Sequence, residues 1–260
     1  MNTYENLILE QQDDIAIITL NRPASLNAFN RALLTDLGHA VNEVNNNDEV
    51  SVVILAGNGR AFCAGADLAE QATPRLTAQE LLVQIYKPIL MSITNAPKPW
   101  ISAVNGAAAG VGSAFAMNCD LTVMAENAYI YQAFAFVGLI PDGGATWHLT
   151  RTLGRKRAFE LIATGEKLSA GKCETLGLCN RVVPVESLMV ETIKWAQELA
   201  TRAPLSLRYA KQSVNFAAEN SLEQTIIDEA ALQLICSASE DAREGTTAFL
   251  EKRAPQWKGR

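Results

Sequence analysis

The 260-residue sequence predicts an α/β protein with a helical C-terminal region. Up to about residue 150, short apolar runs typical of strands alternate with segments of helical periodicity. Beyond that point, segments rich in leucine, alanine and charged residues indicate helices separated by glycine or proline. We therefore expect a core over residues 1–198 and a helical region over residues 199–260, too tightly linked to the core to form an independent domain.

The expected elements follow one another in a regular order. Ile15–Leu20 is a β-rich run that ends at a turn signal, Asn21-Arg22-Pro23, and predicts a strand. From Asn30 to Val44, apolar residues recur at helical spacing. The later elements are a buried strand at 50–55, a helix from about Ala78 that is kinked or broken at Pro88, strands at 100–104 and 119–124, and helices at 204–217, 221–236 and 240–251.

Composition and charge exclude several classes of protein. With 48% hydrophobic and 19% charged residues, the chain can bury a full core, so disorder is not expected. The net charge of −6 argues against nucleic acid as a partner, because no basic stripe could neutralise phosphates. The densest basic cluster, residues 151–157, could bind at most a small anion and is more simply explained as a solvated helix start.

Cysteine and histidine usage predicts a reduced, metal-free protein. The five cysteines form no CxxC pair, and neither His39 nor His148 has a second ligand at metal-binding spacing. The first residues lack the basic and apolar regions of a signal peptide, and no apolar run approaches the roughly 18 residues of a membrane span. We therefore expect a cytoplasmic protein without membrane or metal partners.

The stretch GLIPDGGATWHLTR, residues 138–151, holds the carboxylate of Asp142 on a tight loop. Pro141 fixes its own φ, and Gly143 and Gly144 allow backbone angles that other residues avoid. Asp142 is therefore expected to lie against apolar residues rather than on a solvated face. It is either a turn or N-cap residue before a helix that starts near Gly143, or the acid or base of an active site.

Two glycine-rich turns, Gly59–Leu68 and Asn105–Phe115, each follow an expected strand. Their small side chains let backbone N–H groups approach a ligand, and the second turn opens a helix whose free N–H groups favour negative charge. This second turn resembles the dinucleotide fingerprint GxGxxG, but Phe115 replaces the third glycine, so a Rossmann site is not expected. Taken by itself, the second turn could be explained by the packing of small residues where a helix meets the sheet. Two such turns and a loop-held carboxylate together indicate an oxyanion hole.

The sequence resembles the crotonase (enoyl-CoA hydratase/isomerase) superfamily almost from end to end. The matching stretches are ITLNRPASLNAF, GRAFCAGADL, KPWISAVNGAAAGVGSAFAMNCD, GLIPDGGATWHLTRTLG and EGTTAFLEKRAPQW. The resemblance implies a spiral core of ββα turns and a C-terminal helical region that builds a homotrimer or a dimer of trimers. It also implies an acyl-CoA thioester substrate and no separate cofactor, because coenzyme A enters as part of the substrate.

The resemblance also implies roles for particular residues. Family members hold the thioester oxygen with two backbone N–H groups, which by motif position are those of Ala64 and Val111. Phe249 and Lys252 are implied in CoA binding, from the same or from a neighbouring subunit. The adenine of CoA is implied to lie along Ala64, Gly65, Ala66, Asp67 and Leu68, where Asp67 is either structural or adenine-facing.

Departures from the hydratase pattern favour an isomerase. Hydratases of the family use two glutamates to activate water, and the matching positions here hold Ala114 and Phe134, which cannot transfer a proton. The remaining carboxylate is Asp142, in a motif most similar to the isomerase branch that includes epoxyphenylacetyl-CoA isomerase. We therefore expect Asp142 to carry a proton as a 3-enoyl-CoA becomes a 2-enoyl-CoA, or in a related isomerisation.

Other assignments stay open at this stage. The same fold could support hydration, or nucleophilic attack by Asp142 as in the 4-chlorobenzoyl-CoA dehalogenase branch. A non-catalytic acyl-CoA-binding protein is a further alternative, against which the presence of Asp142 argues. The remaining expectations are that Phe62, Phe134 and Phe136 form acyl-pocket walls or core, that Trp147 and His148 are packing and surface residues, and that Asp120 begins or ends a core strand.

Overall fold

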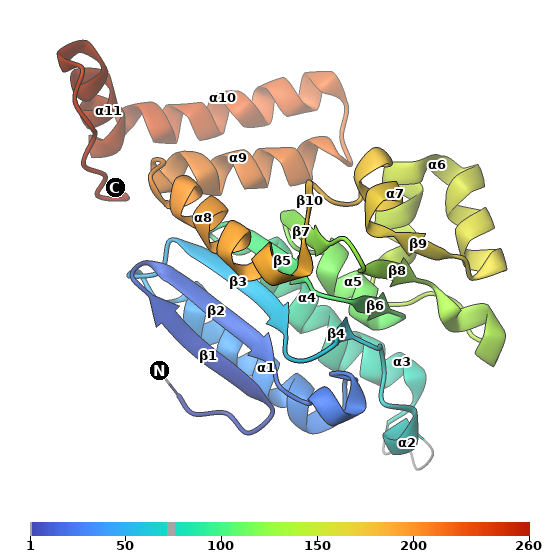
Figure 1. Cartoon of the computed structure of the whole chain (residues 1–260). Coiled ribbons are helices and arrows are strands. Elements are labelled where there is room, and N and C mark those ends of the chain that lie inside the picture. Colours follow the sequence, from blue (N-terminus) through green and yellow to red (C-terminus); the bar gives the residue numbers. More distant parts are fainter. Residues whose placement is uncertain (1, 72–75) are drawn as a thin grey trace.

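The computed structural model describes residues 2–71 and 76–260, which form two sheets surrounded by helices (Figure 1). The larger sheet has the strand order β1-β2-β3-β5-β7-β10, and the smaller has the order β4-β6-β8-β9. The strands of the larger sheet are β1 (Leu7–Gln12), β2 (Ile15–Leu20), β3 (Val52–Gly57), β5 (Trp100–Val104), β7 (Leu121–Ala125) and β10 (Arg181–Val183). Those of the smaller sheet are β4 (Ala61–Cys63), β6 (Ala107–Ala109), β8 (Tyr129–Tyr131) and β9 (Lys167–Ser169).

Both sheets are mainly parallel. In the larger sheet β1 is antiparallel to β2, and each following pair is parallel. In the smaller sheet β4, β6 and β8 are parallel and β9 is antiparallel to β8. Helices α1 (Arg31–Asn45) and α8 (Leu188–Ala200) pack against the larger sheet. The continuous apolar runs of β3 and β5 are fully buried, as expected for parallel strands covered by helices.

The expected early elements are confirmed, with shifted ends for two strands. The strands at 15–20 and 100–104, β2 and β5, have the predicted bounds, whereas β1 was not predicted. The side chain of Asn30 caps α1 by accepting a hydrogen bond from the Leu33 N–H. The strands expected at 50–55 and 119–124 begin two residues later, at Val52 and Leu121. The first shift arises because Val50 donates its N–H to Asn47 within a turn, so it cannot yet join the sheet.

The break expected at Pro88 is wrong. Helix α3 (Ala78–Glu80), a π-helical segment (Leu81–Tyr86) and α4 (Lys87–Thr94) follow one another without interruption. Pro88 lies within this continuous helix, two residues after the π-helical segment, and it has no N–H to donate to the carbonyl four residues back. The irregularity lies instead in the π-helical segment, where the Lys87 N–H bonds to the Leu82 carbonyl, five residues back.

The remaining elements include the start of β7 and further helices, one of which is interrupted. Asp120 directly precedes β7, as expected for a residue that begins a core strand. Helix α6 is interrupted at Gly154, where φ is +74°. These helices are α2 (Leu68–Gln71), α5 (Val111–Met117), α6 (Ala145–Thr164), α7 (Ala170–Thr175), α9 (Pro204–Ala217), α10 (Leu222–Ala238) and α11 (Glu240–Glu251).

The three C-terminal helices match the prediction and extend away from the sheets. Helix α9 lies beside α8, α10 packs on α9, and α11 stands at the far end (Figure 1). Helices α10 and α11 expose large apolar side chains, including those of Ile227, Leu234 and Phe249. The predicted boundary at residue 199 falls in the last turn of α8, and both this division and the trimer stay predictions.

A buried lysine ties α9 to the core. The Lys211 side chain is only 8% exposed, and its Nζ donates hydrogen bonds to Asp120 Oδ2 at 2.8 Å and to the carbonyl of Ile93 at 2.8 Å. Burial raises the pKa of Asp120, and the Lys211 charge opposes that rise. The carboxylate therefore depends on this one cation for its charge partner within the described part of the chain.

Replacing Lys211 with methionine is expected to destabilise the protein by about 3 kcal/mol, because it leaves the buried Asp120 without its partner. Urea denaturation followed by circular dichroism measures the loss. The matched control is Lys258→Met, which removes an exposed ion pair with Glu240 and should change stability by less than about 1 kcal/mol. Equal stabilities of the two variants would contradict the anchoring role.

Candidate active site

The two glycine-rich turns meet at one edge of the smaller sheet. Because β4 and β6 are parallel neighbours, the turns that follow them emerge side by side. A Cβ placed on Gly65 would lie 3.0 Å from the Ala109 carbonyl oxygen, and one on Gly112 would lie 2.7 Å from the Cys63 carbonyl oxygen. Glycine at these positions therefore permits a backbone contact that any side chain would prevent.

Backbone hydrogen bonds decide which amide of the first turn is free. The Ala64 N–H donates to the Leu26 carbonyl at 3.0 Å, so the fold already uses it, and the prediction of Ala64 as an oxyanion donor is not supported. Phe29 bonds through its N–H to Gly65 and through its carbonyl to Asp67. In such a parallel bridge the intervening Ala66 turns its own N–H away from Phe29.

The second turn supplies another amide. Val111 is the first residue of α5, so its N–H has no acceptor within the helix. Gly110, with φ of +53°, donates its own N–H to Tyr131 and directs the chain into α5. The contact between Gly65 and Gly110 brings the Ala66 and Val111 segments together, which is the arrangement required for a paired N–H site.

The two positions at which hydratases carry glutamate lie at this junction and are apolar. A Cβ on Gly143 would lie 3.0 Å from the Ala114 Cβ and 2.9 Å from the Val111 Cγ2, so Ala114 faces the loop that carries Asp142. The Phe134 ring is buried, and its Cζ would lie 3.7 Å from a Cβ on Gly110. Neither side chain can transfer a proton.

Asp142 lies on the neighbouring loop, largely buried. Its Oδ1 is buried and has no hydrogen-bond partner in the described part of the chain, and burial raises the pKa of its carboxyl to about 6. Gly143 and Gly144 have φ values of +59° and +87°, which explains why glycine follows the carboxylate. Helix α6 begins at Ala145 without a side-chain cap, so Asp142 is not its N-cap, but the Asp142 carbonyl accepts the Ala145 N–H at 3.0 Å and so begins the expected turn.

Asp67 and Leu68 are placed differently. Asp67 forms an ion pair with Arg22 at 3.0 Å and also accepts a hydrogen bond from the Ala69 N–H. This bonding agrees with the structural interpretation of Asp67 and leaves its adenine-facing role a prediction. Leu68 is exposed.

The two C-terminal candidates for CoA binding lie far from the glycine turns. Phe249 is exposed on α11, and Lys252 follows the end of that helix. Helix α11 stands at the far end of the C-terminal helices, well separated from strand β4 (Figure 1). Within one chain the structure therefore does not bring Phe249 and Lys252 to the first glycine turn, and their contribution from a neighbouring subunit stays a prediction.

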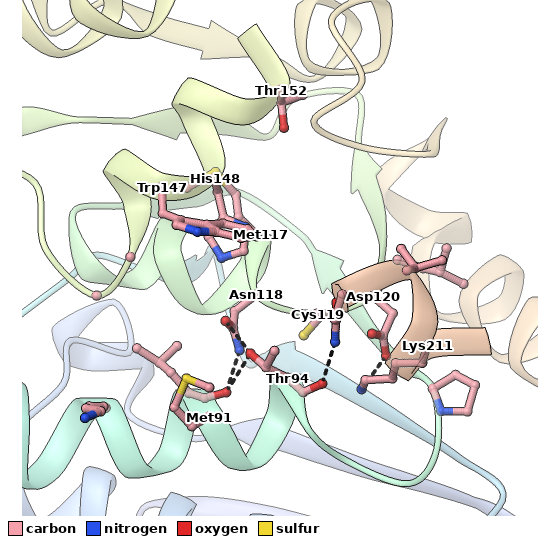
Figure 2. A pocket seen from close by; sticks show the side chains of 18 of the residues that line it. Met91, Thr94, Met117, Asn118, Cys119, Asp120, Trp147, His148, Thr152 and Lys211 are labelled. Atoms are coloured by element: carbon pink, nitrogen blue, oxygen red, sulfur yellow. Dashed lines mark hydrogen bonds and ion pairs between the residues drawn. The ribbon is translucent and has the colours of Figure 1, made fainter. Parts of the chain in front are cut away.

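A cavity of about 980 Å³ lies between α4, α6 and α9 (Figure 2). Met91 from α4, His148 from α6 and Lys211 from α9 are among its walls. It reaches the Asp142 loop at Gly143. Tyr86 also lines it, and the hydroxyl of Tyr86 is close enough to feel the Asp142 charge. The cavity therefore adjoins the site, although its walls do not include the two glycine turns.

Trp147 and His148, expected to be packing and surface residues, both line this cavity. The Arg151 guanidinium stacks on the Trp147 ring at 4.1 Å. Burial, together with the nearby Arg151, lowers the pKa of His148 to about 4, so the imidazole is neutral at physiological pH. Among the predicted pocket aromatics, Phe62 is a core residue, and Phe136 is 68% exposed and belongs to neither wall nor core.

Two features are absent from residues 2–71 and 76–260, the ranges that the structure describes. In these ranges no three or more His, Cys, Asp or Glu side chains gather in a way that could hold a metal ion. The same ranges contain no helix that is long and apolar enough to cross a membrane.

Two mixed sheets, paired glycine turns and C-terminal helices define an acyl-CoA enzyme of the crotonase fold. The chain belongs to the enoyl-CoA hydratase/isomerase family, whose sequence profile matches residues 10–260. It is 37% identical to 1,2-epoxyphenylacetyl-CoA isomerase of Escherichia coli K12, with 98% of this chain and 99% of the relative covered. It is 36% identical to 2,3-dehydroadipyl-CoA hydratase of the same strain, with 98% and 99% covered. An enoyl-CoA hydratase structure from Polaromonas sp. JS666 superposes with a TM-score of 0.91 at 36% identity, covering 97% and 99% of the two chains.

Proposed function

We propose that the protein is an enoyl-CoA isomerase that converts a 3-enoyl-CoA to a 2-enoyl-CoA, or catalyses a related isomerisation, through a thioester enolate. One observation carries this proposal. At the junction of the two glycine turns and the 138–144 loop, Asp142 supplies a carboxylate with a raised pKa and no ion-pair partner among the described residues, whereas Ala114 and Phe134 occupy the hydratase glutamate positions. The site therefore lacks the two glutamates that would activate water, but it has one carboxylate that can transfer a proton.

The amides of Ala66 and Val111 hold the thioester oxygen in this mechanism, with Ala66 in the place first expected for Ala64. Deprotonation next to the thioester carbonyl moves an electron pair onto that oxygen. Two fixed N–H donors stabilise the resulting negative charge, and the loss of one such donor typically lowers the rate about 10²- to 10³-fold. Gly65, Asp67 and Leu68 remain proposed neighbours of the CoA adenine.

Asp142 carries the proton between two carbons of the acyl group. Its carboxylate takes a proton from C2, and the electrons of the broken C–H bond form the enolate, which is conjugated with the 3,4 double bond. The carboxylic acid then returns the proton to C4, which leaves the double bond between C2 and C3. A base whose pKa lies near the working pH is both ionised and strong, and burial brings Asp142 into that range.

Product identification tests this proposal against the hydratase and binding-protein alternatives. Purified protein is incubated separately with a 3-enoyl-CoA and a 2-enoyl-CoA, and the products are identified by mass spectrometry and ultraviolet absorbance. We expect the 3-enoyl thioester to become conjugated and the 2-enoyl thioester to gain little or no water. Hydration as fast as isomerisation would overturn the proposal, and binding without turnover would identify a non-catalytic protein.

The isomerisation rate is expected to rise with pH through about 6. Burial raises the pKa of Asp142 to about 6, and only the ionised carboxylate can accept the C2 proton. His148 lies beside the same loop, but its pKa of about 4 keeps it neutral over most of this range. Its titration therefore does not account for the rise of the rate near pH 6. The measurement is kcat/KM between about pH 4.5 and 8, which reports on the free enzyme. A rate that stays constant or falls across this interval would contradict the assignment of Asp142 as base.

A further inference from the structure

Two buried oxygen atoms near the proposed reaction centre have no hydrogen-bond partner among residues 2–71 and 76–260. They are the Tyr86 hydroxyl and Asp142 Oδ1. The Tyr86 side chain is almost fully buried, with 2% of the residue exposed. Native proteins pair nearly all buried polar atoms, and a phenylalanine would fill the same space without an unpaired hydroxyl. The hydroxyl of Tyr86 therefore calls for an explanation other than packing.

Several contacts place Tyr86 against the Asp142 loop. Its ring packs edge-on against Phe115, with 6.2 Å between centroids, and Phe115 directly follows Ala114. Leu90, one helical turn after Tyr86, would lie 3.7 Å from a Cβ on Gly143. Burial raises the pKa of the Tyr86 hydroxyl, and the Asp142 charge is the next largest cause of that rise. The phenol and the carboxylate thus lie within each other's electrostatic field.

The other acidic groups that act on Tyr86 already have partners. Cys63 and Glu70 also raise the pKa of Tyr86, by less than Asp142 does. The Cys63 thiol donates to the Asn27 carbonyl at 3.1 Å, and the Glu70 carboxylate accepts the Arg31 N–H at 2.8 Å. Of these three groups, Asp142 is the one whose buried oxygen is unpaired.

The local backbone also points to a functional position. Tyr86 is the last residue of the π-helical segment, and the two flanking helices are otherwise regular. A π turn inserts one extra residue per turn and rotates the side chains that follow it, and such segments occur frequently at functional sites. Here the rotation sets the direction in which Tyr86 and Leu90 face the loop.

We propose that Tyr86 is a positioning residue for Asp142. Once the thioester fills the site, the Tyr86 hydroxyl donates a hydrogen bond to Oδ1 of the ionised Asp142 carboxylate. This inference rests on the proposed isomerase function. Gly143 and Gly144, both with positive φ, let the loop adjust so that the two oxygens meet. With Oδ1 held by Tyr86, Oδ2 faces the carbons between which the proton moves.

Tyr86→Phe tests the hydrogen bond because it removes only the hydroxyl. A hydrogen bond to a charged group is among the stronger ones, so we expect kcat to fall about 10-fold or more, with KM changed less than about twofold. In the kcat profile, which reports on the enzyme–substrate complex, the acid limb should move to higher pH, because the ionised carboxylate loses a donor. The limb of the kcat/KM profile should stay where it is in the wild type.

The matched control is Tyr4→Phe, which removes a tyrosine hydroxyl that donates to Glu43 at 2.8 Å, outside the proposed site. Both of its kinetic profiles should equal those of the wild type. If Tyr86→Phe leaves kcat and both limbs unchanged, Tyr86 only packs and the inference is wrong. A rise in KM alone would make Tyr86 a substrate contact and would also overturn it.

A separate readout distinguishes this inference from the proposed function. In heavy water, wild-type protein and a 3-enoyl-CoA should exchange the C2 hydrogen for deuterium. If the wild type shows neither exchange nor isomerisation, the proposed function fails. If the wild type exchanges and Tyr86→Phe exchanges equally fast with the same pH profiles, only the positioning role fails.

Discussion

Asp142→Asn is expected to lower the isomerisation rate by about 10² or more while acyl-CoA binding persists. Asparagine keeps the shape of the side chain and can still form hydrogen bonds, but it cannot accept the C2 proton. The amides proposed to hold the thioester oxygen belong to the backbone of other segments, so they should remain in place. Steady-state kinetics give the loss of rate, and calorimetry with an unreactive acyl-CoA gives the affinity.

Deuterium exchange sharpens this test. Wild-type protein in heavy water should incorporate deuterium next to the thioester, and Asp142→Asn should not. Asp67→Asn is the matched control, because it also converts a loop carboxylate to an amide but breaks the ion pair with Arg22 instead. Full turnover by Asp142→Asn would show that another group is the base, and Asp67 would be the first to examine.

Asp142→Asn, which should lower the rate, should also make the stability of the protein less dependent on pH. The folded-state pKa of Asp142 is raised from 3.8 to about 6, so the fold favours the protonated carboxyl. That stabilisation is present below about pH 4 and is lost as pH rises through about 6, with an upper limit of about 3 kcal/mol. Asp142→Asn carries no charge to bury, so its free energy of unfolding should fall less over this interval. Urea denaturation at both ends of the interval therefore separates a catalytic defect from misfolding.

The apolar residues at the hydratase positions suit this chemistry. Burial is the largest cause of the raised Asp142 pKa, and Ala114 is part of the wall against which its loop packs. A glutamate at position 114 would place a second negative charge near Asp142 and would draw water into the wall. The apolar residues that stand in place of the glutamates therefore also help to raise the pKa of Asp142.

Local sequence signals account for much of the fold. The β-rich run Ile15–Leu20 and the helical spacing that follows Asn30 predict β2 and α1 correctly, because β2 is buried on both faces and α1 buries one face with helical period. Pro141 and the following glycines likewise predict a constrained loop at Asp142. Each of these features depends on neighbours in the sequence.

Features that depend on tertiary contacts could not be predicted. Ala64 and Ala66 look alike in the sequence, and only the hydrogen bond from Ala64 to Leu26 shows which amide is already used. Tyr86 lies in a segment that resembles any apolar helix, and no local signal marks its π turn. The cavity requires α9, which begins forty residues after the end of α6. Conformation at a site is thus harder to predict than the presence of the site.

Gly112→Ala should reduce isomerisation by about 10² through geometry alone. The added Cβ would lie 2.7 Å from both the carbonyl oxygen and the Sγ of Cys63, so α5 must move away from β4. That movement separates the amide of Val111 from that of Ala66, and the thioester oxygen loses one of its two proposed donors. Overpacking should also destabilise the protein by about 1–3 kcal/mol.

Gly171→Ala is the matched control for this glycine. Residue 171 lies in α7, with nothing within 4 Å of an added Cβ, so alanine should leave activity unchanged and stabilise the helix by up to about 1 kcal/mol. The two variants thus add the same methyl group, to a tight contact in one case and to open space in the other. Kinetics and urea denaturation of both variants measure the difference. If Gly112→Ala kept full kcat, the spacing between the two glycine turns would not govern the reaction, and the paired-amide mechanism would have to be abandoned.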